Sequence, residues 1–393
     1  MISMKRILFV INSLGLGGAE KSLISLLNTL DFDRYLVDLL MFQPQGMFLK
    51  LLPESVNILP VPDFLTSNNS VLHQIKKPKY LSARLSASFA LRMNNRTKKL
   101  HPAQCYWKYT HNCFDILDVK YDVAVAWGQG NPTHFVAEKV LANKKLAVIN
   151  VNYSGAGHNK EFDSPFYELF DCIVTVSDDL NMLTRKTFPQ YADRMVTLYD
   201  ITNAEMIWQL ADEGNPFSNE TCQLILVTAG RLTPQKGYDL AIDAANILSD
   251  RGIDFKWFFV GDGISRKELE QQIAKYDLKQ RVILTGAKDN PYVYMKNADI
   301  YVQTSRFEGY CLTISEARIL NKPIVSTDFD VVHNQLTNER NGLIVDMNGI
   351  AIAEAIIRLS NDEQLRDSLI ENLKREKKGN TEEIEKLYRL IEE

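Results

Sequence analysis

The sequence lacks any hydrophobic run long enough to cross a membrane, because no stretch of about 18 consecutive apolar residues occurs in the chain. It also lacks the small-residue cleavage site of a secretory signal peptide. The first segment, MISMKRILFVINSLGLGG, is instead typical of a buried strand followed by a glycine loop. We therefore expect a cytoplasmic protein.

Cysteine is scarce, and its arrangement excludes two classes of protein. The chain has 5 cysteines among 393 residues, an odd number, and no two form a Cys-x-x-Cys pair. This pattern argues against a disulfide framework and against a zinc site. The cysteines are expected to be reduced, and no metal-ligating set is predicted.

Acidic residues are absent between Asp63 and Asp115, although the whole chain has a net charge of −4 that indicates no nucleic-acid partner. The gap contains nine cations: Lys76, Lys77, Lys79, Arg84, Arg92, Arg96, Lys98, Lys99 and Lys108. Apolar and aromatic residues such as Leu85, Phe89 and Tyr109 are interspersed among them. Residues 76–108 are therefore expected to form either a surface for an anionic membrane or a solvated helix pair at the rim of a cleft.

Composition and length favour a soluble α/β protein of two domains, with 45% hydrophobic and 24% charged residues. Short apolar runs alternate with helix-like segments, and the pattern restarts near CQLILVTAGRL, after the polar stretch ADEGNPFSNET. We predict two doubly wound Rossmann-like domains facing across a cleft, over residues 1–200 and 201–375. Residues 376–393 are predicted to form a helix that packs back on the first domain.

Glycines follow the first predicted strand and precede a helix, at Gly15, Gly17 and Gly18. Glycine at this place lets a ligand approach the backbone amides, although a tight strand-to-helix turn explains the residues equally well. The dinucleotide fingerprint is incomplete, because GLGGAE has no third glycine and no acid follows a second strand at the required distance.

The segment AGRLTPQKGYD places two cations, Arg231 and Lys236, on one loop between a strand and a helix. An arginine fork and a mobile lysine suit a diphosphate and could neutralise it as a leaving group. Merely solvated cations at a helix entry are the alternative.

Two carboxylates flank the junction between the strand-like run ADIYVQTS and a predicted helix, at Glu308 and Glu316. The amides of Gly309, Tyr310, Cys311 and Leu312 are expected to be free to hold phosphate oxygens at the helix start. Glu316 lies about one turn inside the helix, on the face of Leu312, where the hydroxyls of a sugar would satisfy it. A capping glutamate and a structural ion pair are the alternative.

Taken together, Glu308 and Glu316 within FEGYCLTISEA, GRLTPQKG upstream, GDG at 261–263 and the Gly-x-Gly-Gly loop resemble the retaining GT-B glycosyltransferases of family 4. The resemblance spans nearly the whole chain. It implies that the C-terminal domain holds a nucleotide-sugar donor and that the N-terminal domain holds the acceptor.

The resemblance also implies roles for individual residues. Arg231 and Lys236 would bind the diphosphate, Glu316 the ribose and Glu308 the donor sugar, assisted by the amides from Gly309 to Leu312. The other implied binding positions are Gly261 of the GDG segment, Ala287 and Lys288 near the base, and Gly15, Gly17 and Gly18 on the acceptor and phosphate side. No metal or other cofactor is implied.

The chain departs from the family at a histidine that many relatives carry after the strand corresponding here to LAVINVNYSGAG. The nearest aligned residues are Asn150 and Asn152. Asn150 would keep a hydrogen-bonding role, or His158 would reach the site from its loop; a surface histidine is the alternative. Without either residue, the leaving phosphate can itself accept the proton of the acceptor.

These observations predict retaining transfer of a hexose or N-acetylhexosamine, from a UDP-sugar by family frequency, to a hydroxyl of a glycan. A lipid-linked acceptor in bacterial capsule, exopolysaccharide or cell-wall synthesis is expected. Two alternatives stay open: a nucleotide-sugar epimerase of the same fold, and a non-catalytic nucleotide-sugar-binding partner of an active transferase. The sequence does not specify the sugar, the linkage or the oligomeric state.

Overall fold

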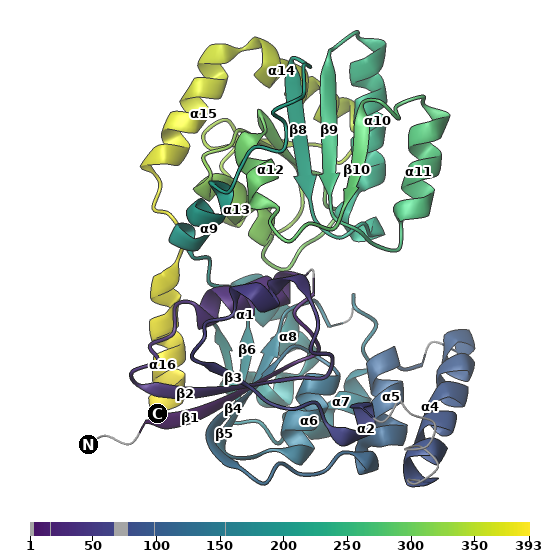
Figure 1. Cartoon of the computed structure of the whole chain (residues 1–393), viewed down its shortest axis with the longest axis vertical. Coiled ribbons are helices and arrows are strands. Elements are labelled where there is room, and N and C mark those ends of the chain that lie inside the picture. The colour runs from purple at the N-terminus through teal and green to yellow at the C-terminus, as the bar shows by residue number, and fades with distance from the viewer. Residues whose placement is uncertain (1–3, 16, 67–77, 98, 154) are drawn as a thin grey trace. The chain divides into compact units, whose positions relative to one another are not determined.

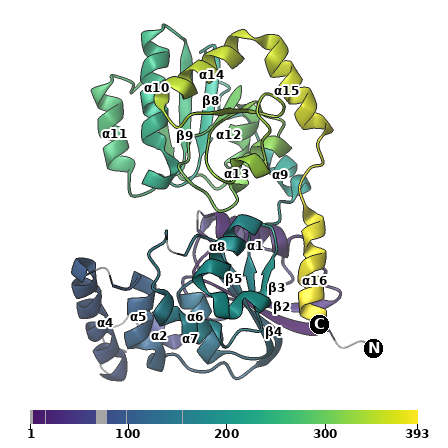
Figure 2. The same ribbon diagram turned by 180° about the vertical axis from the view of Figure 1, so that it is seen from behind.

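Parallel strands form two separate sheets in this chain. The computed structural model describes residues 4–15, 17–66, 78–97, 99–153 and 155–393. One compact unit contains the chain up to Gly15, then Ala19–Asp200 and finally Glu382–Glu393, and the other consists mainly of Ile201–Thr381. Figures 1 and 2 show each unit as a sheet flanked by helices. The predicted α/β fold with two Rossmann-like domains is confirmed.

In the first unit the described strands pair in the order β3-β2-β1-β4-β5-β6-β7, all parallel. The strands are β1 (Lys5–Ile11), β2 (Tyr35–Met41), β3 (Val56–Ile58), β4 (Lys120–Trp127), β5 (Leu141–Ile149), β6 (Cys172–Thr175) and β7 (Met195–Thr197). The helices are α1 (Gly18–Leu27), α2 (Asp63–Thr66), α4 (Pro78–Thr97), α5 (Pro102–Thr110), α6 (Asn131–Lys139), α7 (Lys160–Tyr167), α8 (Asp178–Thr187) and α16 (Ile384–Glu392).

In the second unit the strand order is β10-β9-β8-β11-β12-β13, again parallel. The strands are β8 (Leu224–Ala229), β9 (Phe255–Val260), β10 (Val282–Gly286), β11 (Ile300–Gln303), β12 (Ile324–Thr327) and β13 (Leu343–Val345). The helices are α9 (Ala204–Ala211), α10 (Tyr238–Asp250), α11 (Arg266–Lys275), α12 (Tyr292–Asn297), α13 (Leu312–Ile319), α14 (Gly349–Asn361) and α15 (Glu363–Arg375).

The continuous apolar strands of the second unit are explained by helices on both faces of its sheet. Every residue of β8 is buried. Its alternate residues enter two different cores: Leu224 and Leu226 pack with α10, α11 and α14, whereas Ile225 and Val227 pack with α9, α12 and α13. Because successive side chains of a strand point to opposite faces and both faces of this sheet are covered, apolar residues occupy four successive positions from Leu224 to Val227.

The C-terminal helix α16 packs against the first unit. The ring of Tyr388 stacks on that of Tyr35 with centroids 5.4 Å apart. Lys5 Nζ donates a hydrogen bond to the carbonyl oxygen of Ile391 at 2.9 Å, and Lys5 also forms an ion pair with Glu392 at 2.8 Å. The chain therefore rejoins the first unit at Glu382.

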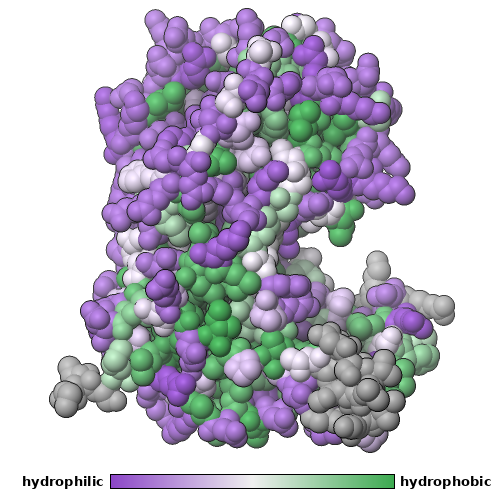
Figure 3. All heavy atoms as spheres, in the orientation of Figure 1, coloured by the Kyte–Doolittle hydropathy of each residue, from purple (hydrophilic) through white to green (hydrophobic). Residues whose placement is uncertain are grey.

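Helices α4 and α5 occupy the acid-free part of the sequence and pack against each other. The inner face of α4 buries Tyr80, Ala83 and Ala87, whereas its outer face exposes an apolar row. In Figure 3 apolar side chains are visible at the position of α4. Lys76, Lys77, Lys98 and the side chain of Arg96 lie outside the described part of the chain. Among the described helices, none combines the length and apolarity that a transmembrane span requires.

Candidate functional site

The predicted donor residues lie on loops at the carboxyl ends of neighbouring strands in the second unit. Strand order reverses between β8 and β11, so the loop after β8 and the loop after β11 are adjacent. The first carries Arg231 and Lys236, and the second carries Glu308 and leads into α13. Ligands of open α/β sheets bind at such a switch point.

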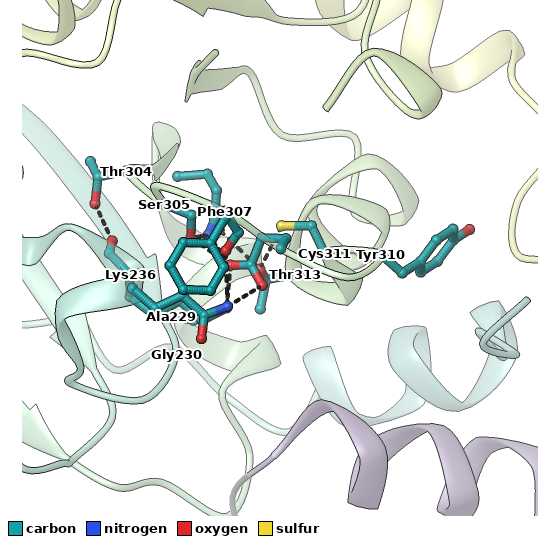
Figure 4. Close-up of polar contacts among 12 residues, drawn as sticks. Ala229, Gly230, Lys236, Thr304, Ser305, Phe307, Tyr310, Cys311 and Thr313 are labelled. Atoms are coloured by element: carbon teal, nitrogen blue, oxygen red, sulfur yellow. Dashed lines mark hydrogen bonds and ion pairs between the residues drawn. The ribbon is translucent and has the colours of Figure 1, made fainter. Parts of the chain in front are cut away.

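Lys236 and Glu308 form a nearly buried ion pair, with Nζ and Oε1 2.7 Å apart and side-chain exposures of 16% and 8%. Figure 4 shows Lys236 beside Ser305 and Phe307. Burial by itself would lower the pKa of Lys236, and the nearby charge of Arg231 lowers it further. The Glu308 carboxylate outweighs both effects, so the pKa of Lys236 is raised above its ordinary value. Lys236 therefore stays a cation at neutral pH.

A network of neutral polar side chains holds the Glu308 carboxylate, and the sequence analysis did not identify it. Ser305 Oγ donates to Glu308 Oε1 at 2.5 Å, and Gln235 Nε2 donates to Oε2 at 3.3 Å. Gln303 Nε2 donates to Ser305 Oγ at 2.7 Å, and Thr313 Oγ1 donates to Gln303 Oε1 at 2.9 Å. The signal was present in the sequence as Gln-Thr-Ser at the polar end of an apolar strand.

Glycine is required where two of these loops approach other backbone segments. Gly237 has φ of 63°, and an added Cβ would lie 2.0 Å from the Thr304 carbonyl oxygen. At Gly261 an added Cβ would lie 1.8 Å from the carbonyl oxygen of Gly230. The loops after β8, β9 and β11 are thus fixed to one another by contacts that no other residue permits.

Helix α13 begins directly after a residue in the left-handed conformation. Cys311 adopts a left-handed conformation with φ of 66°, directly before the first helical residue, Leu312. Burial and the nearby Glu308 raise the pKa of the Cys311 thiol to about 12, so it is a neutral thiol. Gln335 Nε2 donates to the carbonyl oxygens of Tyr310 and Cys311. Gly309 and Tyr310 precede this turn, and Figure 4 shows the Tyr310 ring pointing away from Lys236.

Glu316 is buried in α13, with 2% exposure, and accepts a hydrogen bond from Tyr292 Oη at 3.0 Å. Burial and the Glu316 carboxylate raise the pKa of Tyr292 well above its ordinary value, so Tyr292 remains a donor. A protein hydroxyl thus contacts Glu316, the kind of partner that a ribose would provide.

The remaining predicted residues of the second unit lie at the same edge of the sheet. Arg231 is exposed, and Ala287 and Lys288 follow β10 and are partly buried. No ion pair of Arg231 or Lys288 occurs among the described residues. The second unit therefore brings together the predicted donor residues on the loops after β8, β9, β10 and β11.

Gly15 and Asn150 follow β1 and β5 in the first unit. Gly17 precedes α1, and Gly18 is the first residue of that helix. An added Cβ at Gly15 would lie 3.6 Å from Ser13 Oγ, an ordinary contact, so packing within the chain does not require glycine there. Neither side-chain polar atom of Asn150 has a hydrogen-bond partner among the described residues, although both are buried. Such an amide is available to a ligand.

His158 is a nearly buried residue rather than a surface one, with 5% side-chain exposure. Its ring stacks on His101 with centroids 4.0 Å apart, and Nδ1 lies 3.7 Å from Asp163. His134 Nε2 lies 2.7 Å from the other oxygen of Asp163. Burial by itself would raise the pKa of Asp163, but the hydrogen bond with His134 and the neighbouring His158 ring lower it below its usual range. The structure gives His158 these partners within its own unit.

Residues 215–376, which form most of the second unit, match the family model described as glycosyl transferases group 1. An alpha-D-kanosaminyltransferase of Streptomyces kanamyceticus is 30% identical over 151 residues, which are 38% of this chain and 39% of that protein. A poly(ribitol-phosphate) alpha-N-acetylglucosaminyltransferase of Staphylococcus aureus is 25% identical over 257 residues, covering 64% of this chain and 50% of that one.

Among solved structures, Anabaena HepE in complex with UDP and glucose superposes with a TM-score of 0.68 at 17% identity, over 99% of each chain. This likeness shows the fold, and it agrees with the predicted GT-B class. The sequence matches to curated relatives cover less of each protein than the structural matches do. The chain spans half or less of the length of four curated relatives that it matches.

Proposed function

We propose, from the match of residues 215–376 to the family model of glycosyl transferases group 1, that this protein transfers a sugar from a UDP-sugar to a hydroxyl of a glycan. The observation that carries the proposal is the placement of Arg231, the Lys236–Glu308 pair and the α13 N-terminus at one switch point. A diphosphate is the ligand that two cations and a helix terminus suit best.

The donor would bind with its diphosphate near Arg231 and Lys236 and with its sugar toward Glu308. Arg231 is exposed and could turn toward a ligand, whereas Lys236 is already held by Glu308. As the bond from the sugar to the diphosphate breaks, negative charge grows on the leaving oxygen, and the fixed cation stabilises it. Glu316 would accept the ribose hydroxyls, and the loop at Ala287 and Lys288 would contact the base.

Retention at the anomeric carbon and independence of metal are parts of the proposal. Both relatives described above are named as alpha-transferases, and an α-linked donor that gives an α-linked product reacts with retention. Asn150 fits the acceptor side better than His158, because its amide has no partner among the described residues whereas His158 contacts Asp163.

The donor site is tested by calorimetry with UDP, GDP and ADP, each with and without EDTA, on the wild type and on Arg231→Ala. We expect UDP to bind equally well in EDTA, and Arg231→Ala to weaken it about tenfold or more. Arg251→Ala is the matched control, because Arg251 is also exposed in the second unit but pairs with Glu354. Binding of no nucleotide, or equal binding by Arg231→Ala, would refute the donor site. Turnover of donor without acceptor would indicate an epimerase, and binding without either reaction a non-catalytic partner.

A lipid-linked acceptor at an anionic membrane is the second part of the proposal, and the outer face of α4 supports it. Leu81, Leu85, Phe89 and Met93 recur every four residues and are 39%, 63%, 68% and 46% exposed. Exposed cations, Lys79 and Arg92, lie on the same helix. A row of apolar side chains beside cations is suited to the interface of an anionic bilayer.

Liposome co-sedimentation tests this part. Phe89→Asp is expected to reduce binding to vesicles containing phosphatidylglycerol, whereas Ile350→Asp should not, because Ile350 is equally apolar and 61% exposed but belongs to the second unit. Binding that ignores both the anionic lipid and Phe89→Asp would refute the membrane surface while leaving the donor site untouched.

A further inference from the structure

A short polar turn, formed by Gly128, Gln129 and Gly130, follows β4 in the first unit. Strand order reverses between β1 and β4, so this turn lies at the switch point of the first sheet, and β5 is the neighbour of β4 on the other side. The two glycines have φ of 123° and 82°, which glycine adopts without strain. The parallel ladder between β4 and β5 ends just before the turn, at the pair of Trp127 and Val148.

The side chain of Gln129 continues the hydrogen bonding of the sheet beyond the end of this ladder. Its Oε1 accepts from the backbone N of Asn150 at 3.2 Å, and its Nε2 donates to the carbonyl oxygen of Val151 at 2.9 Å. Gln129 and Asn150 are 21 positions apart, the same offset as between the last paired residues of the two strands. The primary amide of Gln129 thus takes the place of a backbone peptide group and fixes the main chain at Asn150 and at the next residue.

The Asn150 side chain is the group that this pair of hydrogen bonds positions. Its Nδ2 and Oδ1 are both buried, and neither has a hydrogen-bond partner among the described residues. A Cβ added at Gly128 would lie 3.6 Å from Nδ2, so the amide lies beside the backbone of the turn. A buried donor and a buried acceptor that are both unpaired cost free energy, which a ligand that pairs with them would recover.

The chemistry of a carboxamide selects the class of that ligand. A sugar hydroxyl both donates and accepts hydrogen bonds, so one hydroxyl or two neighbouring hydroxyls would satisfy Nδ2 and Oδ1 of Asn150 together. An oxygen of a phosphate or a carboxylate only accepts, so it would pair with Nδ2 and leave Oδ1 unsatisfied. The Asn150 amide is therefore suited to a neutral sugar rather than to an anion.

We propose that Gln129 is a positioning residue of the acceptor site, which holds the Asn150 amide where it binds a hydroxyl of a neutral sugar. The assignment of this sugar to the acceptor rests on the proposed transferase function. Val151 is 42% exposed, so packing alone would hold the main chain only weakly at this point if the two hydrogen bonds of Gln129 were removed. Gln129 was not among the residues predicted from the sequence.

The test is NMR of the Asn150 side-chain amide in the isotope-labelled full chain, with the signal assigned by its loss in Asn150→Ala. The probes are the methyl glycosides of glucose, galactose and N-acetylglucosamine, and inorganic phosphate is the anionic comparison. UDP is present throughout, and its own affinity is measured by calorimetry on the same samples. We expect at least one neutral glycoside to shift the Asn150 signal in a saturable way and phosphate to leave it unchanged.

Substitutions of Gln129 separate positioning from packing. Gln129→Ala should weaken the binding of the glycoside about tenfold without changing the affinity for UDP. Gln129→Glu keeps the size of the side chain and an acceptor for Asn150 N, but it has no donor for the carbonyl oxygen of Val151. It should therefore weaken binding as well, whereas a packing role would leave it equal to the wild type. Gln190→Ala is the matched control, because Gln190 is an exposed glutamine of the first unit that donates to Ser164 Oγ.

Each remaining outcome decides between the proposals. An Asn150 signal that no glycoside moves, equal glycoside affinity in the wild type and Gln129→Glu, or a response to phosphate as strong as that to the glycoside would overturn the positioning role. A wild type that fails to bind UDP would refute the transferase function, and the glycoside titration would still decide whether Asn150 binds a sugar. If Gln129→Ala does not fold, Gln129→Glu and the wild-type titration give the same decision.

Discussion

The ion pair between Lys236 and Glu308 predicts an asymmetric double-mutant cycle. In Glu308→Gln the buried Lys236 loses its carboxylate partner, and breaking a buried pair in this way costs about 3–5 kcal/mol. In Lys236→Met the Glu308 carboxylate keeps donors from Ser305 and Gln235, at 2.5 and 3.3 Å. The loss should then be that of one charge-assisted hydrogen bond, about 1.5–3 kcal/mol.

The double variant Lys236→Met/Glu308→Gln contains no unpaired buried charge, so its loss should fall below the sum of the single losses by at least about 1 kcal/mol. Urea unfolding followed by hydrogen exchange of peptides from residues 224–345 restricts the measurement to the second unit. Losses that add to within about 0.5 kcal/mol would refute the coupling and indicate a solvated pair.

The pH dependence of Glu308→Gln provides an independent check. Without the carboxylate, burial should lower the folded-state pKa of Lys236 below its ordinary value of 10.5. The unfolded chain then binds more protons over that interval, so the stability of this variant should rise as pH increases toward 10.5. In the wild type the folded-state pKa of Lys236 is raised, so the stability that its ion pair contributes should be lost only as the pH rises above 10.5. A variant whose stability follows the wild-type pH profile would contradict this account.

Three further predictions concern other parts of the chain. Gly237→Ala should destabilise the second unit far more than Gly252→Ala in thermal unfolding. Both glycines have positive φ, but only at Gly237 would the added Cβ lie 2.0 Å from a carbonyl oxygen, so similar losses of stability would contradict the packing argument. Burial and His158 lower the pKa of His101 to about 4. Stability should therefore fall as the pH is lowered from 6.5 to 4, because the unfolded chain binds a proton that the folded chain does not. His101→Gln should flatten this pH dependence, and an unchanged dependence would exclude His101 as its cause. Tyr292→Phe should cost about 1.5–3 kcal/mol in urea unfolding, because it removes a donor from the buried Glu316, and a neutral effect would show that the hydrogen bond contributes nothing.

The sequence alone determined the alternation of apolar strands and helices, the two-domain organisation and the loops that carry the predicted donor residues. These features depend on the local periodicity of hydrophobic residues and on the glycine and polar residues that mark turns, both of which can be read from the linear sequence. The segment ADIYVQTS followed by FEGYCLTISEA, for example, indicated β11, its polar end and the start of α13 without any tertiary information.

Which side chains meet depends on the packing of strands and helices that are far apart in the sequence. Lys236 and Glu308 are 72 positions apart and come together because β8 and β11 are neighbours in the sheet, an order that hydrophobic periodicity does not encode. His158 lies in a loop, as predicted, but its stacking on His101, 57 positions earlier, depends on the chain segments at the starts of α5 and α7 meeting, where Gln104 also bonds to the backbone of Asn159. Long-range pairing of this kind follows from strand order and helix packing, so the sequence could name the candidate residues, whereas the fold determined their partners, burial and charge state.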